Sequence, residues 1–260
     1  SADYNTSGTG GLDITKQVTN HAMADDQFSF TITATGDNAD AAAEKLGIQD
    51  GVSTEVKSAA AAAGVAKSVK NNPFETVSFD KSDDGVTYTY TIKENGKTGE
   101  GGYKNYVLDT NTYTVEITPT DNGDGTMTVK TVVNDTETTD QRVTVAFVNS
   151  YKADPTTVGA KGAATIEGTK TLKNDDIANY TGENAFKFQV KSGDVVVAEG
   201  TNDADGNITF GDITYTTEKL AAAVNGGSDE VGTATAQTTH AGTVDTFHYT
   251  LGEGAPDQST

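Results

Sequence analysis

Three polar residues of this 260-residue chain stand at positions where a buried apolar side chain is expected, and their types can react with one another. Side chains two residues apart on a strand point to the same side, so Lys16 shares a face with its apolar neighbours at positions 14 and 18. Glu94 continues the apolar face of residues 88–92 in the same way. Asn149 lies between two aromatic residues of the alternating run 143–151. All three side chains are therefore expected to point into a core.

A lysine amine, a carboxyl group and an amide in one apolar core can form a covalent crosslink. An unpaired buried charge costs on the order of several kcal/mol, so we expect Lys16 and Glu94 to contact each other or to become neutral. Desolvation favours a neutral lysine amine, which is a nucleophile, and a protonated carboxyl group, which can polarise the carbonyl of Asn149. Attack of Lys16 on that carbonyl, with Glu94 shuttling protons, would expel ammonia and leave a Lys–Asn isopeptide bond. Proximity and water exclusion suffice, and no cofactor is required.

Two of the three residues recur in the C-terminal half of the chain. Glu253 follows Lys170 at nearly the same spacing as Glu94 follows Lys16 (253 − 170 = 83 against 94 − 16 = 78). A single charged residue at a strand end can simply lean into solvent, but a repeated set of inward positions favours the buried interpretation. We therefore interpret the chain as a tandem duplication joined near residues 152–162. The matching segments are 28–30 with 186–188, and 86–96 with 244–254 after insertion of one residue.

The two expected domains differ in completeness. The first, residues 12–152, contains all three residues, and Asn149 stands far downstream of Glu94 (149 − 94 = 55). The second, residues 163–260, ends shortly after Glu253 (260 − 253 = 7). We therefore expect the second β-sandwich repeat to lack its C-terminal strands and Lys170 to stay unlinked within this chain.

The elements that must position these residues are β-strands. Threonine and other polar residues alternate with β-branched and aromatic ones, a period of two that is typical of strands with one buried face. Asn-Gly and Asp-Gly pairs between the runs favour tight hairpins. We predict an all-β fold, an antiparallel sandwich or barrel, with short helices at 39–46, 53–70 and 217–224. The expected strands include 14–18, 28–32, 87–92, 113–117, 143–147 and 166–172.

Composition excludes several functional classes. The 38 acidic and 18 basic residues give a formal charge of −20, and such a surface repels nucleic acid and anionic membranes. The absence of cysteine excludes disulfides, thiolate nucleophiles and Cys-ligated metals. The three histidines, His21, His240 and His248, have no metal-site or triad spacing. With neither a membrane-spanning apolar run nor a signal-like N-terminus, we expect a soluble, processed or excised piece.

The order of the motifs carries a resemblance. A lysine in the first strand, Tyr-x-Tyr-Thr-Ile-x-Glu at 88–94 and Phe-x-Asn-x-Tyr at 147–151 resemble the isopeptide-linkage domain of Gram-positive major pilins, the streptococcal T-antigen type. The resemblance covers about residues 12–151 and 164–254. In the second repeat it rests on the segments 168–172, 201–210 and 249–253.

This resemblance implies two tandem Ig-like or collagen-adhesin-like β-sandwiches, the first locked by a self-formed bond between its first and last strands. It assigns Lys16 as the nucleophile, Asn149 as the acceptor and Glu94 as the catalytic acid. Glu253 takes the place of Glu94 in the second repeat, and Lys170 is the corresponding crosslink lysine. We expect no metal, no cofactor and no enzymatic turnover beyond the autocatalytic crosslink.

The function that follows from the resemblance is mechanical. We expect a structural stalk or shaft module of a Gram-positive surface pilus or adhesin, in which a covalent tie between terminal strands prevents extension under force. The expected location is extracellular, on a cell-wall-anchored fibre whose anchor is not in this chain. The expected partners are neighbouring domains or subunits of the same fibre and a strand that completes the second domain, with no nucleic acid and no membrane.

Two alternatives remain open from the sequence. The chain could be an adhesin domain that binds a host protein or glycan through loops or the helical insert at 39–70, although this insert contains no aromatic residue before Phe74. It could also be an enzyme or accessory module that acts on polysaccharide. Paired carboxylates are easily found among 38 acidic residues, so they carry little information.

Overall fold

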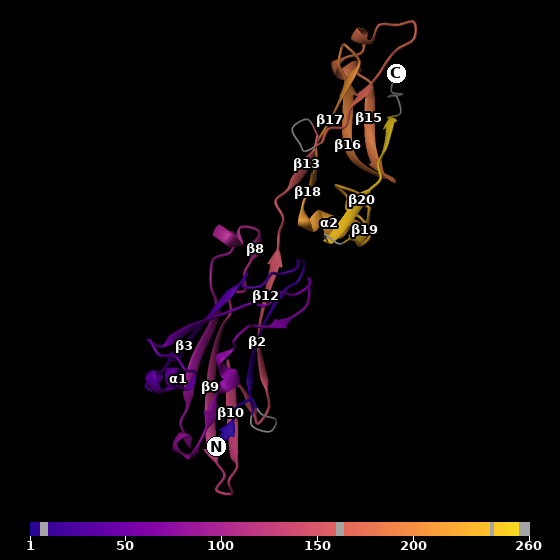
Figure 1. Cartoon of the computed structure of the whole chain (residues 1–260). Helices are drawn as coiled ribbons and strands as arrows, with labels where there is room; N and C mark the ends of the chain where they lie inside the picture. Colours follow the sequence, from indigo (N-terminus) through magenta and orange to yellow (C-terminus); the bar gives the residue numbers. More distant parts are fainter. Residues whose placement is uncertain (6–9, 160–163, 240–241, 255–260) are drawn as a thin grey trace. The chain divides into compact units, whose positions relative to one another are not determined.

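The chain is described by a computed structural model that covers residues 1–5, 10–159, 164–239 and 242–254. It divides into two compact units, Ser1–Tyr151 and Lys152–Thr260, both drawn in Figure 1. Strands make up most of the regular structure in each unit and the two α-helices are short, which confirms the all-β fold class. His240 and residues 160–163 of the expected junction lie outside the described residues.

Six strands form the larger sheet of unit 1, residues 1–151: β3 Ser29–Thr35, β4 Ser53–Lys57, β7 Tyr88–Glu94, β9 Thr112–Asp121, β10 Met127–Val133 and β11 Thr136–Thr139. They pair antiparallel in the order β11-β10-β9-β7-β3-β4. The alternating sequence produces these strands because every second side chain faces the core. In β7, for example, Tyr88, Tyr90, Ile92 and Glu94 are buried.

Four strands form the smaller sheet of unit 1: β2 Leu12–Val18, β5 Lys67–Ser68, β8 Tyr106–Val107 and β12 Val143–Tyr151. Their order is β5-β2-β12-β8, and β2 and β12 are parallel neighbours. The register places Lys16 beside Phe147 and Val18 beside Asn149. A separate two-stranded pair joins β1 Ala2–Asp3 to β6 Ser78–Phe79.

The two sheets of unit 1 face each other across one apolar core. Phe30 comes from the larger sheet and Phe147 from the smaller one, and their ring centroids are 4.9 Å apart. Helix α1, Ala39–Lys45, packs on this core through Ala42 and Ala43, and the Tyr90 hydroxyl donates to the Ala42 carbonyl at 2.7 Å. The two sheets and α1 therefore share one core, which encloses the inward-facing side chains of β2, β7 and β12.

Unit 2, residues 152–260, has a five-stranded antiparallel sheet in the order β14-β17-β16-β15-β21. Its core is smaller and includes Phe188, Val190, Phe210 and Ile213. The bounds of these strands are β14 Gly168–Thr169, β15 Lys187–Ser192, β16 Val195–Asn202, β17 Asn207–Phe210 and β21 Thr250–Glu253.

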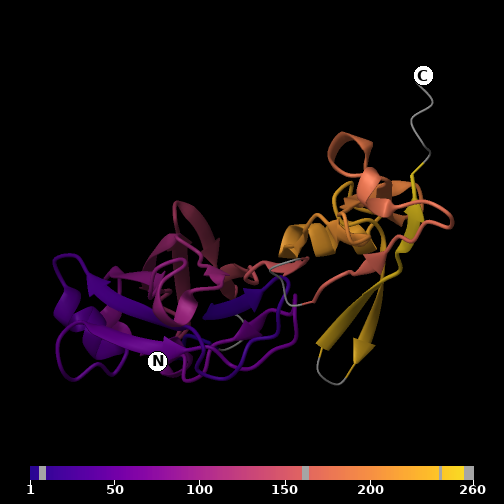
Figure 2. The same cartoon turned by 90° about the horizontal axis from the view of Figure 1, so that it is seen from above.

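The remaining elements of unit 2 lie outside that sheet. Strand β13, Thr156–Val158, pairs with β18, Ile213–Tyr215, and helix α2 spans Thr217–Val224. Strands β19, Ala234–Thr239, and β20, Gly242–Phe247, form a separate hairpin, which Figure 2 shows standing apart from the larger sheet.

The regular structure also includes short 3-10 turns, which span Pro73–Thr76, Lys81–Asp83, Gly101–Tyr103, Ile177–Asn179 and Gly182–Asn184.

No helix in the described part of the chain is long and apolar enough to cross a membrane.

One predicted helix is wrong. Helices are present at 39–45 and 217–224 as expected, but the segment 53–70 contains the strands β4 and β5 instead. Val56 is buried opposite Phe30 at the edge of the larger sheet, so strand pairing here outweighs the helix propensity of the alanine-rich stretch that follows. The helical insert expected at 39–70 is thereby reduced to the single short helix α1.

The predicted strand 166–172 is shorter than expected, because only Gly168–Thr169 pair with β17. The chain then passes close to the Asp-Gly turn between β16 and β17, where the Lys170 N–H donates to the Gly206 carbonyl at 2.7 Å. Gly206 has a φ of 85°, and a Cβ atom there would collide with the Lys170 carbonyl. This glycine therefore lets the turn hold the main chain of Lys170.

Candidate functional site

Lys16, Glu94 and Asn149 meet in the core of unit 1. The Lys16 Nζ atom lies 2.8 Å from Glu94 Oε1, and the Asn149 Nδ2 atom donates to Glu94 Oε2 at 2.7 Å. One carboxyl group therefore bridges the lysine nitrogen and the amide nitrogen, with each of its oxygens on one of them.

The fold brings these residues together from both sheets. Lys16 on β2 and Asn149 on β12 belong to neighbouring parallel strands of the smaller sheet, offset by two residues, and both side chains point into the core. Glu94 is the last residue of β7 in the opposite sheet, where it pairs with Phe30. The period-two pattern fixes the inward direction of each side chain, and the parallel pairing of β2 with β12 sets their separation.

The surroundings of the lysine nitrogen are aromatic and closed to solvent. The side chains of Lys16 and Glu94 are both 0% exposed. The Lys16 Nζ atom lies 4.9 Å from the ring centroid of Phe28 and 5.8 Å from that of Phe30. Bulk solvent therefore has no access to the pair, and the rings provide only weak stabilisation of an ammonium charge.

Burial pushes both ionisable groups toward their neutral forms. Desolvation lowers the pKa of the Lys16 ammonium below its ordinary value, against the attraction of Glu94. Desolvation likewise raises the pKa of the Glu94 carboxyl, against its contacts with Lys16 and Asn149. Both shifts favour the state in which Lys16 is a neutral amine and Glu94 is a protonated carboxyl group. Nucleophilic attack by the amine requires this state.

The orientation of the Asn149 amide is fixed by a residue that the sequence patterns did not indicate. The Asp109 main-chain N–H donates to Asn149 Oδ1 at 2.7 Å, and because a main-chain nitrogen can only donate, the atom facing it must be oxygen. Glu94 consequently contacts the amide nitrogen. The expectation that Glu94 polarises the carbonyl is therefore not what the geometry shows. Asp109 lies in a loop without periodicity, so no sequence signal was available for it.

Unit 2 repeats part of this arrangement. The Lys170 Nζ atom lies 2.9 Å from Glu253 Oε2 and 4.7 Å from the Phe186 ring centroid. Glu253 pairs with Phe188 between β21 and β15, as Glu94 pairs with Phe30.

The pair in unit 2 is less buried than the sequence comparison led us to expect. Lys170 and Glu253 side chains are 23% and 39% exposed. Leu251, which occupies the place of the fully buried Ile92, is 52% exposed. In the described part of unit 2, β21 and β14 are the edges of the sheet, and no asparagine hydrogen-bonds to Glu253. Without strands on those edges, the pair is not enclosed.

A third lysine–carboxylate pair in unit 1 has a different electrostatic character. Lys45 Nζ lies 2.8 Å from Asp83 Oδ2. Although burial opposes ionisation, hydrogen bonds from Lys45 and Tyr88 lower the pKa of the Asp83 carboxyl. The Asp83 carboxyl is therefore favoured in its ionised form, and the Lys45 side chain is partly open to solvent, so this pair is a suitable comparison for Lys16 and Glu94.

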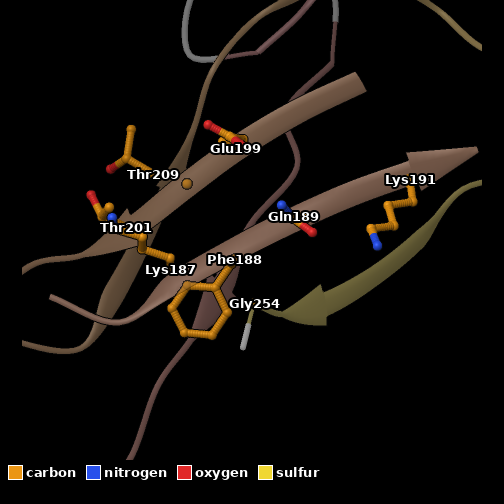
Figure 3. A pocket seen from close by; sticks show the side chains of 9 residues that line it. Lys187, Phe188, Gln189, Lys191, Glu199, Thr201, Thr209 and Gly254 are labelled. Carbon is orange, nitrogen blue, oxygen red and sulfur yellow. The ribbon is translucent and has the colours of Figure 1, made fainter. Parts of the chain in front are cut away.

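The hollow with the largest volume among those found in the described residues lies outside the site of unit 1. A hollow of about 650 Å³ lies on the sheet of unit 2, with Lys187, Gln189 and Lys191 from β15 and Glu199 from β16 around it, as Figure 3 shows. The polar side chains around the hollow are partly or fully exposed, and the buried side chain that lines it is the apolar Phe188. Among the described residues, no three His, Asp or Glu side chains are placed to hold a metal ion.

Comparisons with known proteins give one family match. The family model described as FctA, Spy0128-like isopeptide containing domain, matches residues 12–152. No curated protein sequence matches.

The solved structures that are similar to the chain include two major pilin proteins of Streptococcus pyogenes. The T-13 protein is 16% identical, with 96% of this chain and 76% of that one covered and a TM-score of 0.35. The T3.2 protein is 14% identical, with 81% and 75% covered and a TM-score of 0.29.

The family match agrees with the resemblance seen in the motifs. It spans more than half of the chain and contains the three residues that meet in unit 1. The family is one of structural pilus subunits exposed on the surface of Gram-positive bacteria, and it is not a family of classical enzymes. The chain belongs to the FctA family, the Spy0128-like isopeptide containing domains of Gram-positive pilin backbones.

Proposed function

We propose that unit 1 closes itself with an isopeptide bond between Lys16 and Asn149, and that the bond makes it a force-resistant module of a pilus shaft. The observation that carries the proposal is the buried Glu94 carboxyl group, which lies 2.8 Å from the Lys16 nitrogen and 2.7 Å from the amide nitrogen of Asn149. A carboxyl group in this position touches the atom that must lose a proton and the atom that must gain one.

The reaction can proceed because Glu94 already contacts both reacting residues. The neutral amine of Lys16 attacks Cγ of Asn149, and in the adduct the former amide nitrogen becomes basic. Glu94 then gives its proton to that nitrogen from Oε2 and receives one from the Lys16 nitrogen on Oε1. The C–N bond to the former amide nitrogen breaks, ammonia leaves and Glu94 is again protonated. The carboxyl group acts as a proton relay, with no cofactor.

The proposed bond lies where a pulling force would enter and leave unit 1. Strand β2 is the first long strand of the unit and β12 is the last, and they are parallel neighbours. A covalent link between them would carry tension directly from one to the other. The whole segment between Lys16 and Asn149 would then bear no load.

For unit 2 we propose a partner that supplies a strand. Lys170, Glu253 and Phe186 repeat the contacts of Lys16, Glu94 and Phe28, and the sheet edges beside Lys170 and Glu253 are unpaired within the described residues. A strand with an asparagine between apolar residues, contributed by a neighbouring segment or subunit of the fibre, would bury Leu251 and provide an acceptor for Lys170. The cell-wall-anchored extracellular location follows from this role in a fibre.

The adhesin alternative has less support. The expected helical insert is reduced to α1, which packs on the core, and the hollow in Figure 3 is an open sheet face lined mainly by exposed polar side chains. A host ligand would therefore have to bind the loops, and neither α1 nor the hollow supports such a binding site.

Force spectroscopy tests the mechanical role. A chain held by its two ends should show no extension from residues 16–149 before the bonds of the tether break. In Lys16→Ala, the same segment should unfold and lengthen the molecule by roughly 450 Å, at about 3.4 Å per residue. By analogy with a long-loop disulfide, loss of the bond should also lower stability by about 2–5 kcal/mol. Full extension of the unmodified chain would contradict the proposal.

Bond formation should show a bell-shaped dependence on pH. The reactive state contains one proton shared by Lys16 and Glu94, so the rate falls at low pH when both groups are protonated and at high pH when both have lost a proton. The pKa of Lys16 is lowered and that of Glu94 is raised. The acidic and basic limbs of the rate–pH curve, where the rate falls, therefore both move toward neutral pH.

The measurement starts from chain recovered unfolded, with the uncrosslinked mass verified before refolding at each pH. The linked fraction is then followed by mass spectrometry. A rate that rises steadily with pH, as for an ordinary exposed amine, would contradict the shared-proton mechanism.

A peptide should label unit 2 at Lys170. We expect a synthetic peptide with the sequence of residues 143–151 to form a covalent adduct that survives boiling in detergent, because it offers the Phe-x-Asn-x-Tyr strand that unit 1 supplies internally. The adduct should be absent in Lys170→Ala and with a peptide whose asparagine is alanine. An intrachain link from Lys170, or no adduct, would contradict the proposed strand partner.

A further inference from the structure

We propose that the main-chain N–H of Asp109 is the oxyanion donor for the crosslinking reaction, and that the loop between β8 and β9 is built to hold it there. The inference rests on the proposed Lys16–Asn149 bond and adds a catalytic group to it. Asp109 donates to Asn149 Oδ1 at 2.7 Å, within the range that a donor to a developing oxyanion requires.

The reaction needs such a donor at this atom. When the Lys16 nitrogen bonds to Cγ of Asn149, the electron pair of the C=O double bond moves onto Oδ1. The negative charge then sits in a core from which water is excluded, where an uncompensated charge is costly. When the adduct collapses, the pair returns to the carbonyl and the C–N bond to the former amide nitrogen breaks.

Neither Lys16 nor Glu94 donates a hydrogen bond to Oδ1 of Asn149. Lys16 Nζ is the attacking atom, and Glu94 presents its two oxygens to the two nitrogens. Among the described residues, the hydrogen bond that Oδ1 receives comes from Asp109. The division of roles is therefore between a carboxyl group that moves protons and a main-chain N–H that stabilises charge.

The Asp109 side chain anchors this N–H to the acceptor strand. Its Oδ2 atom accepts from the Val148 N–H at 2.9 Å, one residue before Asn149, and its Oδ1 atom accepts from the Asn111 N–H at 2.9 Å. The preceding residue, Leu108, is buried and donates its N–H to Thr98 Oγ1 at 3.0 Å. The loop is thus attached to the strand that carries the reacting amide, so donor and acceptor keep their relative position without reorganisation.

The sharpest test replaces one atom. An amide-to-ester substitution at residue 109 removes the N–H and keeps the carboxylate. We expect bond formation to slow by roughly 10²–10³-fold, the typical cost of one oxyanion donor. The matched control is the same substitution at Asp121, whose N–H donates to Asp84 Oδ1 at 2.8 Å on the exposed surface. The control should react at the unmodified rate.

The pH profile separates this role from a general structural effect. Because the ester keeps the Asp109 carboxylate and leaves Lys16 and Glu94 unchanged, the two limbs should stay at the same pH while the maximum falls. Equal rates in the ester and the unmodified chain would overturn the proposal for Asp109 alone. Failure of the unmodified chain to crosslink would overturn the proposed bond itself.

Two side-chain variants keep the proposal testable if the ester chain folds poorly. Asp109→Ala retains the N–H but loses its anchor to Val148, and we expect slower crosslinking. Asp109→Asn retains an acceptor for the Val148 N–H and should restore most of the rate. An alanine variant as fast as the unmodified chain, with the same melting temperature, would contradict the anchoring role.

Discussion

The burial of one lysine and one glutamate between two sheets is the constraint on which the rest of unit 1 depends. Charges removed from water are tolerated only when they meet each other or become neutral, and Lys16 and Glu94 can do both because they are in contact and completely enclosed. The aromatic rings of Phe28 and Phe30 exclude water from the lysine nitrogen. In the proposed reaction, this burial favours the neutral amine and the protonated carboxyl group that the attack requires.

The other two lysine–carboxylate pairs differ from Lys16 and Glu94 in the hydrogen bonds to the carboxylate or in the exposure of the side chains. Lys45 and Asp83 have the same contact distance, but hydrogen bonds to the carboxylate keep it ionised. Lys170 and Glu253 have matching neighbours but remain partly exposed, since the strands that would cover them are not among the described elements. Of these three pairs, the one formed by Lys16 and Glu94 combines contact, burial and an amide on the shared carboxyl group.

The sequence predicted the inward-facing positions well and the loops poorly. Period-two alternation placed Lys16, Glu94 and Asn149 on core faces because strand geometry leaves little choice of side. It could not locate Asp109, whose hydrogen bond to Asn149 comes from a main-chain atom in an irregular loop. It also failed at 53–70, where alanines favour a helix locally but an edge of the larger sheet pairs with the segment. The pairing of 53–57 with a distant strand and the use of the Asp109 main-chain N–H do not depend on a local pattern of residue types, so the sequence could not predict them.

The central claim is that Lys16 and Asn149 are covalently joined, and the mass of the folded, purified chain tests it most directly. The intact mass should be lower than the calculated mass by one ammonia, and digestion should give a branched peptide that contains Lys16 and Asn149. The loss should disappear in Asn149→Ala and Glu94→Ala and persist in Lys45→Ala, which disrupts the separate contact with Asp83. An intact mass equal to the calculated one in freshly purified, folded protein would contradict the account.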